Sequence, residues 1–334
     1  MTTSSLGWGI LGTGLIATLF TADLQAVGLR VAAVGSRTVD RAQAFAAEHE
    51  IPAAHGSWQE LVDDPSVDVV YVATPHPAHV AAALMALEAG KHVLVEKAFT
   101  MTAVEAEAIV RLAEERGLVA LEAMWTRFLP HMLEIHAAIE AGEIGDPQVL
   151  IAEHCQALPT DPAHRLNAPE LGGGALLDLG VYPISFAVDL FGPPEQIDAR
   201  AVFTETGVDG RVSGTLVHAG GRHSLFTAAL NIPGVNGATI LGTGGSIVID
   251  PTWYTATGYT VRDRDQQVVR RSQPAVSGRG MQFQAFELER LVREGRIAGD
   301  RMPPAQSVQI MAVLDAIRDT IGLRYPGEGG PTGR

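Results

Sequence analysis

The stretch HVLVEKAF, residues 92–99, changes from apolar to charged within a few positions. Its apolar part suits a strand buried inside a sheet, and Glu96 and Lys97 follow that part directly. In open α/β sheets with parallel strands, ligands bind at the carboxyl ends of the strands. We therefore expect Lys97 to face a ligand and to take part in chemistry there, with Glu96 orienting the lysine or contacting the ligand itself.

A glycine pattern near the N-terminus indicates what that ligand is. Within WGILGTGLIATLF, residues 8–20, Gly12, Gly14 and Ala17 form a G-x-G-x-x-A motif between an expected strand and an expected helix. The first glycine permits a tight turn, the second lets the backbone approach a pyrophosphate, and the small third residue lets the helix pack on the sheet. The motif predicts a dinucleotide site whose contacts include Gly12, Gly14, Leu15 and Ile16.

The end of the next strand discriminates between NAD and NADP. An NAD site carries an acid about 20 residues after the glycines, which accepts a hydrogen bond from the ribose hydroxyl. Here the chain reads VAAVGSRTVDRA, with Ser36 and Arg37 at that place and Arg41 one helical turn later. A hydroxyl and a guanidinium bind a 2′-phosphate, which a carboxylate would repel. NADP is therefore the expected cofactor, and NAD stays open if both arginines are only solvated surface charges.

A third strand end contributes VVYVATPHPAH, residues 69–79. We expect Pro75 to shape a loop along the cofactor and His79 to serve either the following helix or the pocket. Two histidines invite a metal interpretation, but no cysteine or nearby acid completes a ligand set, so no metal is expected. The residues of this stretch that we assign to the cofactor site are Thr74, Pro75, His76 and His79.

The first 124 residues contain the elements that would bring these strand ends to one edge of a sheet. Short apolar runs alternate with Ala- and Glu-rich stretches of helical spacing, such as DRAQAFAAEHE and TAVEAEAIVRLAEERG. Alternation of this kind, with strands apolar throughout, is typical of a parallel sheet covered by helices on both faces. We predict a doubly wound α/β domain over residues 1–124, with strands near 8–11, 30–35, 68–73, 93–95 and 118–121.

The pattern changes after this first region. Helices are expected at 127–141 and 174–190, and most of 197–262 reads as extended segments punctuated by Gly, Pro and Asn. Several strands in succession without intervening helices indicate an antiparallel sheet. We therefore predict a separate α+β domain over residues 125–325.

Near the C-terminus, AQSVQIMAVLDAIRDTIG spaces its apolar residues three and four apart. This spacing predicts an amphipathic helix at 303–322 with one face to bury, and that helix is a candidate to pack back on the first domain. The tail PGEGGPTGR, residues 326–334, is predicted to be disordered.

Composition narrows the class of protein. The 334 residues carry a formal net charge of −14, which argues against nucleic acid or an anionic membrane as partner, because both attract basic surfaces. The single cysteine cannot form an internal disulfide and fits a reducing compartment. The uncharged stretch near the N-terminus lacks the preceding positive charge of a signal peptide and the length of a membrane span. We expect a cytoplasmic protein.

Together these motifs resemble those of one enzyme family. GTGLIA, SRTVDRA, ATPHPAH, VEKAF, EAMWTRFLP and GGGALLDLGVYPI occur in the order found in the Gfo/Idh/MocA oxidoreductases, named after glucose–fructose oxidoreductase, inositol dehydrogenase and rhizopine catabolism. The last three resemble the branch that holds dimeric dihydrodiol dehydrogenases and NADP-dependent xylose dehydrogenases. The resemblance implies an N-terminal Rossmann domain and a C-terminal domain with a large, open, mainly antiparallel sheet. That sheet is expected to carry the substrate wall and to form a homodimer or higher homo-oligomer.

The resemblance also assigns catalytic residues. The family's signature lysine falls on Lys97, and its usual Glu-Lys-Pro reads Glu-Lys-Ala here. Many members carry an Asp and a His four residues apart in the second domain, where this chain has Asp178 and Tyr182. Residues four apart on a helix share one face, so both side chains can project into one cleft.

Neighbouring residues refine this assignment. Pro183 would kink a continuous helix, because it lacks a backbone N–H. The three glycines at 172–174 are expected to let the backbone approach the nicotinamide or its sugar. Trp125 and Arg127 lie at the expected domain junction and are assigned to the walls of the nicotinamide site and the substrate cleft.

These residues suggest reversible hydride transfer between a carbinol carbon and a nicotinamide. Free Tyr and Lys side chains titrate near about 10, too high for a base at neutral pH. A neighbouring ammonium favours a phenolate, and partial burial disfavours an ammonium, so Lys97 beside Tyr182 would lower the pKa of one or both. We assign proton transfer to Tyr182 and electrostatic support to Lys97, with the reverse assignment open. Asp178 is expected to bind a second substrate hydroxyl.

The branch implies an aldose or a cyclic trans-dihydrodiol as substrate, two classes that share a ring with adjacent hydroxyls. Two alternatives remain, namely a closed-cycle sugar oxidoreductase that keeps its NADP bound and a non-catalytic NADPH-binding sensor. The presence of Lys97, Asp178 and Tyr182 together argues against the sensor, which needs no proton-transfer pair. Cys155 lacks an activating pattern, so no covalent role is expected for it.

Overall fold

The computed structural model describes residues 5–327 and divides into two compact units. The first unit comprises the chain up to Phe128 together with Val276–Val308. The second unit comprises Leu129–Ala275 together with the chain from Gln309 onward.

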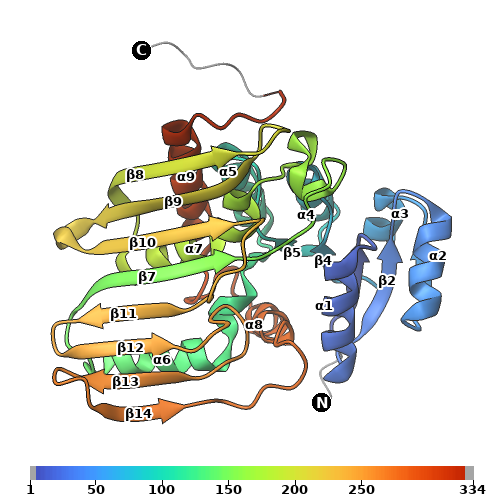
Figure 1. Ribbon diagram of the computed structural model, residues 1–334. Coiled ribbons are helices and arrows are strands. Elements are labelled where there is room, and N and C mark those ends of the chain that lie inside the picture. Colours follow the sequence, from blue (N-terminus) through green and yellow to red (C-terminus); the bar gives the residue numbers. More distant parts are fainter. Residues whose placement is uncertain (1–4, 328–334) are drawn as a thin grey trace. The chain divides into compact units, whose positions relative to one another are not determined.

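The first unit is built on a six-stranded parallel sheet (Figure 1). In spatial order its strands are β3 (Ala53–His55), β2 (Val31–Gly35), β1 (Trp8–Leu11), β4 (Val69–Val72), β5 (His92–Glu96) and β6 (Ala120–Ala123). The order reverses beside β1, which is the kind of switch point where doubly wound sheets bind ligands. The predicted doubly wound domain is confirmed, with β3 as an additional short strand.

Helices connect these strands. They are α1 (Leu15–Ala26), α2 (Val39–Glu48), α3 (Trp58–Asp63), α4 (His79–Glu88) and α5 (Ala103–Arg116). The helix after the Lys97 loop, α5, has clear end signals: the Thr102 hydroxyl accepts a hydrogen bond from the N–H of Glu105 at 3.3 Å, and Gly117 ends the helix in the left-handed conformation.

The first unit also contains α8 (Gln282–Arg293), in a segment that we predicted within the second domain. Two buried acids hold it there. Glu289 accepts a hydrogen bond from the indole N–H of Trp8 at 3.1 Å, and Asp23 accepts two from backbone N–H groups just before α8. These partners lie more than 250 residues apart in the chain, so local sequence patterns give no sign of them.

The second unit contains an eight-stranded sheet that is antiparallel except for one pair (Figure 1). Its strands in spatial order are β14 (Val268–Ser272), β13 (Tyr259–Asp263), β12 (Gly245–Ile249), β11 (Ala238–Gly242), β7 (Pro147–Cys155), β10 (His223–Ala229), β9 (Asp209–His218) and β8 (Pro194–Phe203). Strands β7 and β10 are parallel. The predicted large and mainly antiparallel sheet is confirmed.

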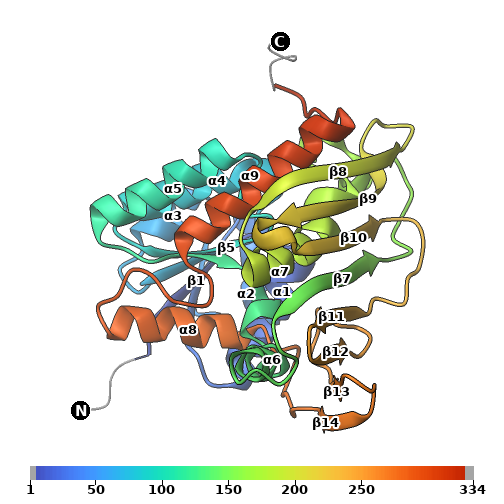
Figure 2. The same ribbon diagram turned by 90° about the vertical axis from the view of Figure 1, so that its left-hand side faces the viewer.

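One face of this sheet is covered by helices α6 (Pro130–Glu140) and α7 (Val181–Phe191), as Figure 2 shows. Burial alternates along β7: Leu150, Ala152 and His154 are buried, whereas Ile151 between them is exposed. Because successive side chains of a strand point to opposite faces, this alternation means that the second face of the sheet is open within the described part of the unit.

Helix α9 (Pro304–Ile321) begins in the first unit and continues into the second, matching the predicted helix at 303–322. Of the tail predicted to be disordered, 326–334, all but the first two residues lie outside the described chain.

Within residues 5–327, one helical stretch is long and apolar enough to span a membrane, Pro169–Phe191. However, 89% of its most apolar window is buried inside the protein. Burial of this kind is typical of a core helix, and the sequence of the stretch is explained by packing.

Candidate functional site

The predicted site residues are divided between the two units. The first unit holds the glycine loop, the ends of β2, β4 and β5, and the segment with Trp125 and Arg127. The second unit holds Asp178 and Tyr182.

The glycine loop joins β1 to α1. Gly12 has φ of +122°, and a Cβ there would lie 2.6 Å from the carbonyl oxygen of Ala73, so only glycine fits. Gly14 differs, because a Cβ there would meet nothing within 4 Å. Gly14 also precedes α1 without any side-chain cap, and Leu15 is 76% exposed.

An open space in front of an uncapped helix N-terminus suits a phosphate group. The loop therefore fits the pyrophosphate of a dinucleotide, with Gly14, Leu15 and Ile16 at the helix start. Ala17 is fully buried, as expected for the small residue that lets α1 pack on the sheet.

The end of β2 presents the residues expected to choose the cofactor. Ser36 is buried and its backbone N–H donates to the carbonyl of His55 at 3.1 Å. Arg37 and Arg41 are both exposed, before and within the first turn of α2. No acid occupies the strand end itself, since Asp40 lies in the first turn of the helix.

Glu96 at the end of β5 is held by the neighbouring strand. Its carboxylate accepts a hydrogen bond from the hydroxyl of Tyr71 in β4, and both side chains are buried. The ring of Tyr71 stacks on Phe20 of α1 with centroids 3.9 Å apart. Sequence reasoning missed Tyr71, although a tyrosine within an otherwise apolar strand is a signal that its hydroxyl has a partner.

Lys97 follows Glu96 and is half-buried. Its backbone carbonyl accepts a hydrogen bond from Nε2 of His76 at 3.2 Å. The peptide bond from Lys97 to Ala98, where the family pattern has proline, is cis.

His79 links the ends of β4 and β5. The ring is fully buried, with Nε2 lying 2.8 Å from the carbonyl oxygen of Thr74 and Nδ1 lying 3.0 Å from that of Ala98. Burial lowers the pKa of His79 to about 3, with a further contribution from His76, so the ring is neutral and donates to one carbonyl at a time. This placement favours the structural alternative for His79, which holds the two loops together.

Trp125 and Arg127 lie in a short 3₁₀ turn, η2 (Trp125–Phe128), and both are buried. The Arg127 guanidinium donates to the carbonyl of Arg301 at 3.2 Å and to the side chain of Gln306 at 2.6 Å. The guanidinium of Arg279 lies 5.6 Å from the centre of the Trp125 ring. All these contacts join η2 to the later segment of the same unit, and they favour a structural role for both residues.

A buried acid that the sequence did not single out lies at the end of β6. Glu122 is almost fully buried, and burial raises its pKa to about 7 despite the opposing influence of Ser307 and Arg127. The charge of Glu96, on the neighbouring strand, also raises it. The carboxyl ends of β5 and β6 therefore carry two acids of the same unit close enough to interact.

In the second unit, Asp178 lies in one π-helical turn, Leu176–Gly180, and Tyr182 in the first turn of α7 that follows it. Both side chains are buried. Pro183 is the third residue of α7 and follows the π-helical turn without a break in the helical segment. A change of helix type lies just upstream of Pro183, and the kink expected from the proline stays a prediction.

Asp178 has a basic partner that sequence reasoning missed. Its Oδ1 lies 3.4 Å from both terminal nitrogens of Arg165, whose side chain is 55% exposed. Arg165 comes from a different loop, thirteen residues earlier.

Aromatic side chains surround Tyr182. Its ring meets His154 edge-on at 4.8 Å and Tyr254 at 5.5 Å, and His154 stacks on Tyr254 at 3.6 Å. The side-chain amide of Gln156 lies 2.7 Å from Nε2 of His154. None of these three neighbours was predicted.

The glycines at 172–174 approach the protein itself. A Cβ on Gly173 would lie 2.6 Å from the carbonyl oxygen of Leu166, and one on Gly174 would overlap the carboxylate of Asp209. Both contacts lie within the second unit. At Gly173 and Gly174 the close approach is to the chain itself, and the expected approach of this segment to the nicotinamide or its sugar stays a prediction.

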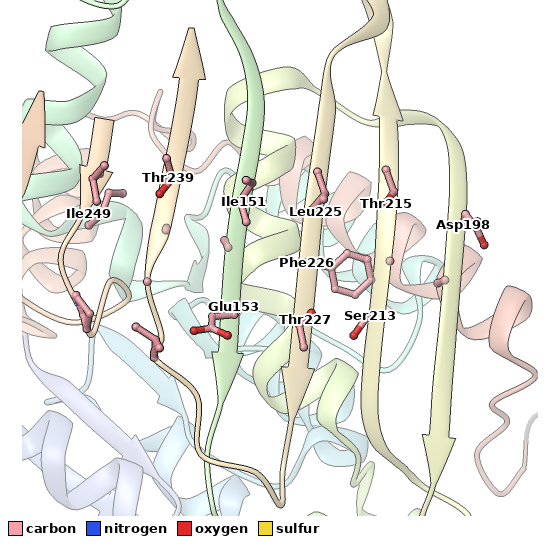
Figure 3. A pocket seen from close by; sticks show the side chains of 18 of the residues that line it. Ile151, Glu153, Asp198, Ser213, Thr215, Leu225, Phe226, Thr227, Thr239 and Ile249 are labelled. Carbon is pink, nitrogen blue, oxygen red and sulfur yellow. The ribbon is translucent and has the colours of Figure 1, made fainter. Parts of the chain in front are cut away.

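A hollow of about 790 Å³ lies on the open face of the eight-stranded sheet (Figure 3). Ile151 of β7, Leu225 of β10 and Thr215 of β9 lie side by side across it, as the strand register requires. Every residue of its lining belongs to the second unit, and none of the predicted site residues is among them. This hollow is therefore separate from the predicted catalytic residues.

Cys155 is buried, and burial raises the pKa of its thiol, so a reactive thiolate is disfavoured. Within residues 5–327, no three His, Cys, Asp or Glu side chains are grouped as metal ligands.

The parallel sheet with its glycine loop, and the charged pair at the end of β5, define a dinucleotide-binding oxidoreductase. The chain belongs to the Gfo/Idh/MocA family. Residues 6–123 match the family described as "Oxidoreductase family, NAD-binding Rossmann fold", and residues 132–248 match the GFO/IDH/MocA C-terminal domain. The resemblance noted in the sequence is thereby confirmed.

Similar proteins include full-length relatives. The chain is 35% identical over 333 residues to the trans-1,2-dihydrobenzene-1,2-diol dehydrogenase of Bos taurus, covering 96% of this chain and 98% of that protein. It is 36% identical over 332 residues to the human protein of the same name, with the same coverage.

Solved structures share the fold. A 3-ketoreductase from Actinomadura kijaniata, in complex with NADP and TDP-benzene, has a TM-score of 0.83 at 25% identity and covers 95% of this chain and 98% of its own. A levoglucosan dehydrogenase, in complex with NADH and levoglucosan, has a TM-score of 0.84 at 23% identity and covers 96% and 98%.

Proposed function

We propose that this protein is an NADP-dependent dehydrogenase that transfers a hydride between a nicotinamide and a carbinol carbon of an aldose or a cyclic trans-dihydrodiol. The observation that carries the proposal is the position of Glu96 and Lys97 at the carboxyl end of β5, in the same sheet whose β1 leads into the glycine loop. Full-length relatives named as dihydrodiol dehydrogenases support the substrate class.

The chain's own residues then have the following roles. Tyr182 moves the proton of the substrate hydroxyl, and the Lys97 ammonium stabilises the phenolate and donates to that hydroxyl. Asp178 accepts a hydrogen bond from a second hydroxyl and is paired with Arg165. The glycine loop, Ser36 and the end of β4 bind and orient the cofactor, whose nicotinamide supplies the hydride chemistry when bound. The proposal requires that Lys97 and Tyr182 act on one substrate molecule.

For the choice of cofactor, exposed Arg37 and Arg41 support NADP, together with the absence of an acid from the end of β2. Replacing Arg37 by Ala removes a charge-assisted contact to the 2′-phosphate, so the Kd for NADPH should rise at least about tenfold. The Kd for NADH should stay unchanged in this variant. The control is Arg111→Ala, which removes an exposed arginine of α5 and should leave the Kd for NADPH and the Kd for NADH unchanged. Equal effects on both nucleotides in Arg37→Ala contradict the proposal.

We also propose that the protein acts as a homodimer through the open face of its eight-stranded sheet, and that it works in the cytoplasm. Ile151 and Leu225 are 46% and 40% exposed on that face, and exposed apolar patches of this kind mark interaction surfaces. The single cysteine supports a reducing compartment.

The test of function is the near-ultraviolet absorbance of NADP⁺ mixed with the purified protein and a panel of aldoses and cyclic trans-diols, with NAD⁺ in parallel. NADPH formed with one class identifies the reaction and the substrate. Demonstrable NADPH binding without turnover of any of them contradicts the dehydrogenase and favours the sensor. Nucleotide that stays with the protein through gel filtration, with sugar-to-sugar exchange, favours the closed cycle.

A further inference from the structure

We propose that Asp209 and Tyr325 are positioning residues, which together clamp the start of the helical segment that carries Asp178 and Tyr182. This inference rests on the proposed function of Tyr182 and Asp178. It concerns side chains that come from a distant strand and from the chain after α9.

The clamped segment has little to hold it from within. It starts at the glycines 172–174, passes through the π-helical turn Leu176–Gly180, and reaches regular α-helix only at Val181. No side chain of the segment itself caps its N-terminal end. The first N–H groups of any helix lack partners inside the helix, so this end depends on groups supplied from elsewhere.

Asp209 supplies the first of these groups. It is the first residue of β9 and is fully buried. One carboxylate oxygen accepts a hydrogen bond from the backbone N–H of Leu176 at 2.7 Å, and the other occupies the place where a Cβ of Gly174 would be. An acceptor at a helix N-terminus stabilises the helix by taking a hydrogen bond from an N–H group that has no partner within the helix. Gly174 is thus glycine because Asp209 needs its space.

Tyr325 supplies the second group, and its hydroxyl would lie 3.3 Å from the same Cβ of Gly174. Its hydroxyl donates to the carbonyl oxygen of Gly173 at 2.7 Å, and its side chain is buried. The guanidinium of Arg318 lies 5.3 Å from the centre of the Tyr325 ring and also contacts Asp315 at 2.7 Å. The end of α9 therefore fixes the tyrosine that fixes the glycine turn.

The clamp acts on the residues assigned to chemistry through the backbone. Asp178 follows the capped Leu176 by two residues, and Tyr182 follows it by six. If the first turn frays, both side chains move. Displacements of about 1 Å in a catalytic group are enough to reduce a rate about 100-fold, so a remote clamp can be felt in kcat.

Three substitutions test the clamp in the full-length protein. Asp209→Ala removes the acceptor, Asp209→Asn keeps one, and Tyr325→Phe removes only a hydroxyl. Tyr259→Phe is the matched control, because it deletes a tyrosine hydroxyl that binds Glu134 at 3.1 Å elsewhere in the same unit. The first measurement is amide hydrogen exchange over residues 175–183, which needs no substrate.

We expect faster exchange over 175–183 in Asp209→Ala and Tyr325→Phe than in the wild type, and wild-type exchange there in Asp209→Asn and Tyr259→Phe. With substrate, kcat should fall at least about tenfold in the first two variants. The KM for the nucleotide should stay unchanged, because the cofactor residues lie in the other unit.

Unchanged exchange in Tyr325→Phe would overturn the clamp, and this variant decides the matter even if Asp209→Ala fails to fold. Equal loss in Asp209→Asn and Asp209→Ala would overturn the hydrogen-bonding role of Asp209. If the wild type turns over no substrate, the proposed function fails, whereas the exchange result still supports or refutes the clamp.

Discussion

At the scale of single residues, the candidate site is defined by partners that sequence alone does not reveal. Lys97 was singled out because it follows an apolar strand, and the structure places it at the carboxyl end of β5. The groups that hold its surroundings, Tyr71 on Glu96 and the ring of His79, come from β4 and the helix after it. Tertiary contacts of this kind depend on the order of strands, which no local pattern encodes.

The proposed proton-transfer pair leads to the first prediction at this scale. Lys97→Met and Tyr182→Phe should each lower kcat by about 100-fold or more, the range expected when a group that moves or supports a proton is lost. The Kd for NADPH, measured by fluorescence titration, should change little in Tyr182→Phe. Full activity in Tyr182→Phe would transfer the role to Lys97.

A second prediction concerns Glu122, whose pKa burial raises to about 7 from its ordinary 4.5. A carboxyl group that binds its proton more tightly in the folded protein stabilises the fold while it is protonated. This contribution to the free energy of unfolding is lost as the pH rises, here from about 4.5 to about 7. Gln cannot lose a proton, so Glu122→Gln should gain melting temperature relative to the wild type across that interval. Calorimetry at about pH 5 and about pH 7.5 measures the difference in melting temperature between Glu122→Gln and the wild type. A difference that is the same at both pH values contradicts the prediction.

At the scale of elements, local patterns predicted the strand–helix alternation and the change to extended segments, because periodicity and glycine placement are written into neighbouring residues. The features that these patterns missed are either very short or depend on residues far apart in the chain. Strand β3 spans only Ala53–His55, and α8 is held to the first unit by Trp8 and Asp23 from the other end of the chain. The glycines at 172–174 were recognised as a close approach, but Asp209 and Tyr325 lie too far along the chain to be linked to them.

The two glycines of the β1–α1 loop give a prediction for this element. Gly12→Ala should destabilise the first unit, because its Cβ would meet the carbonyl of Ala73 at 2.6 Å and its φ of +122° is strained for alanine. Gly14→Ala should fold normally, since its Cβ would meet nothing within 4 Å.

The methyl group that Gly14→Ala introduces would occupy the space where a pyrophosphate is proposed to bind. This variant should therefore weaken NADPH binding at least about tenfold. Thermal melting and nucleotide titration of both variants separate the two effects. Normal nucleotide binding by Gly14→Ala would argue against a dinucleotide at this loop.

At the scale of the whole molecule, the proposed dimer is tested through the open sheet face. Ile151→Asp combined with Leu225→Asp puts two charges per subunit into the proposed contact, so the mass in solution should fall to that of a monomer. Val104→Asp, on an exposed apolar residue of α5 in the first unit, is the control that should leave the mass unchanged. Analytical ultracentrifugation measures all three, and a monomeric wild type would end the proposal.

Strand β7 has a consequence for engineering this protein. Its residues alternate between Leu150, Ala152 and His154 on the helix-covered face and Val149, Ile151 and Glu153 on the open one, with His154 against Tyr182. Two libraries drawn from one stretch of six codons would therefore explore different properties. Randomising the odd-numbered positions should vary self-association while sparing the rings around Tyr182, and randomising the even-numbered ones should do the reverse. Directed evolution could tune substrate range and assembly separately within a single strand.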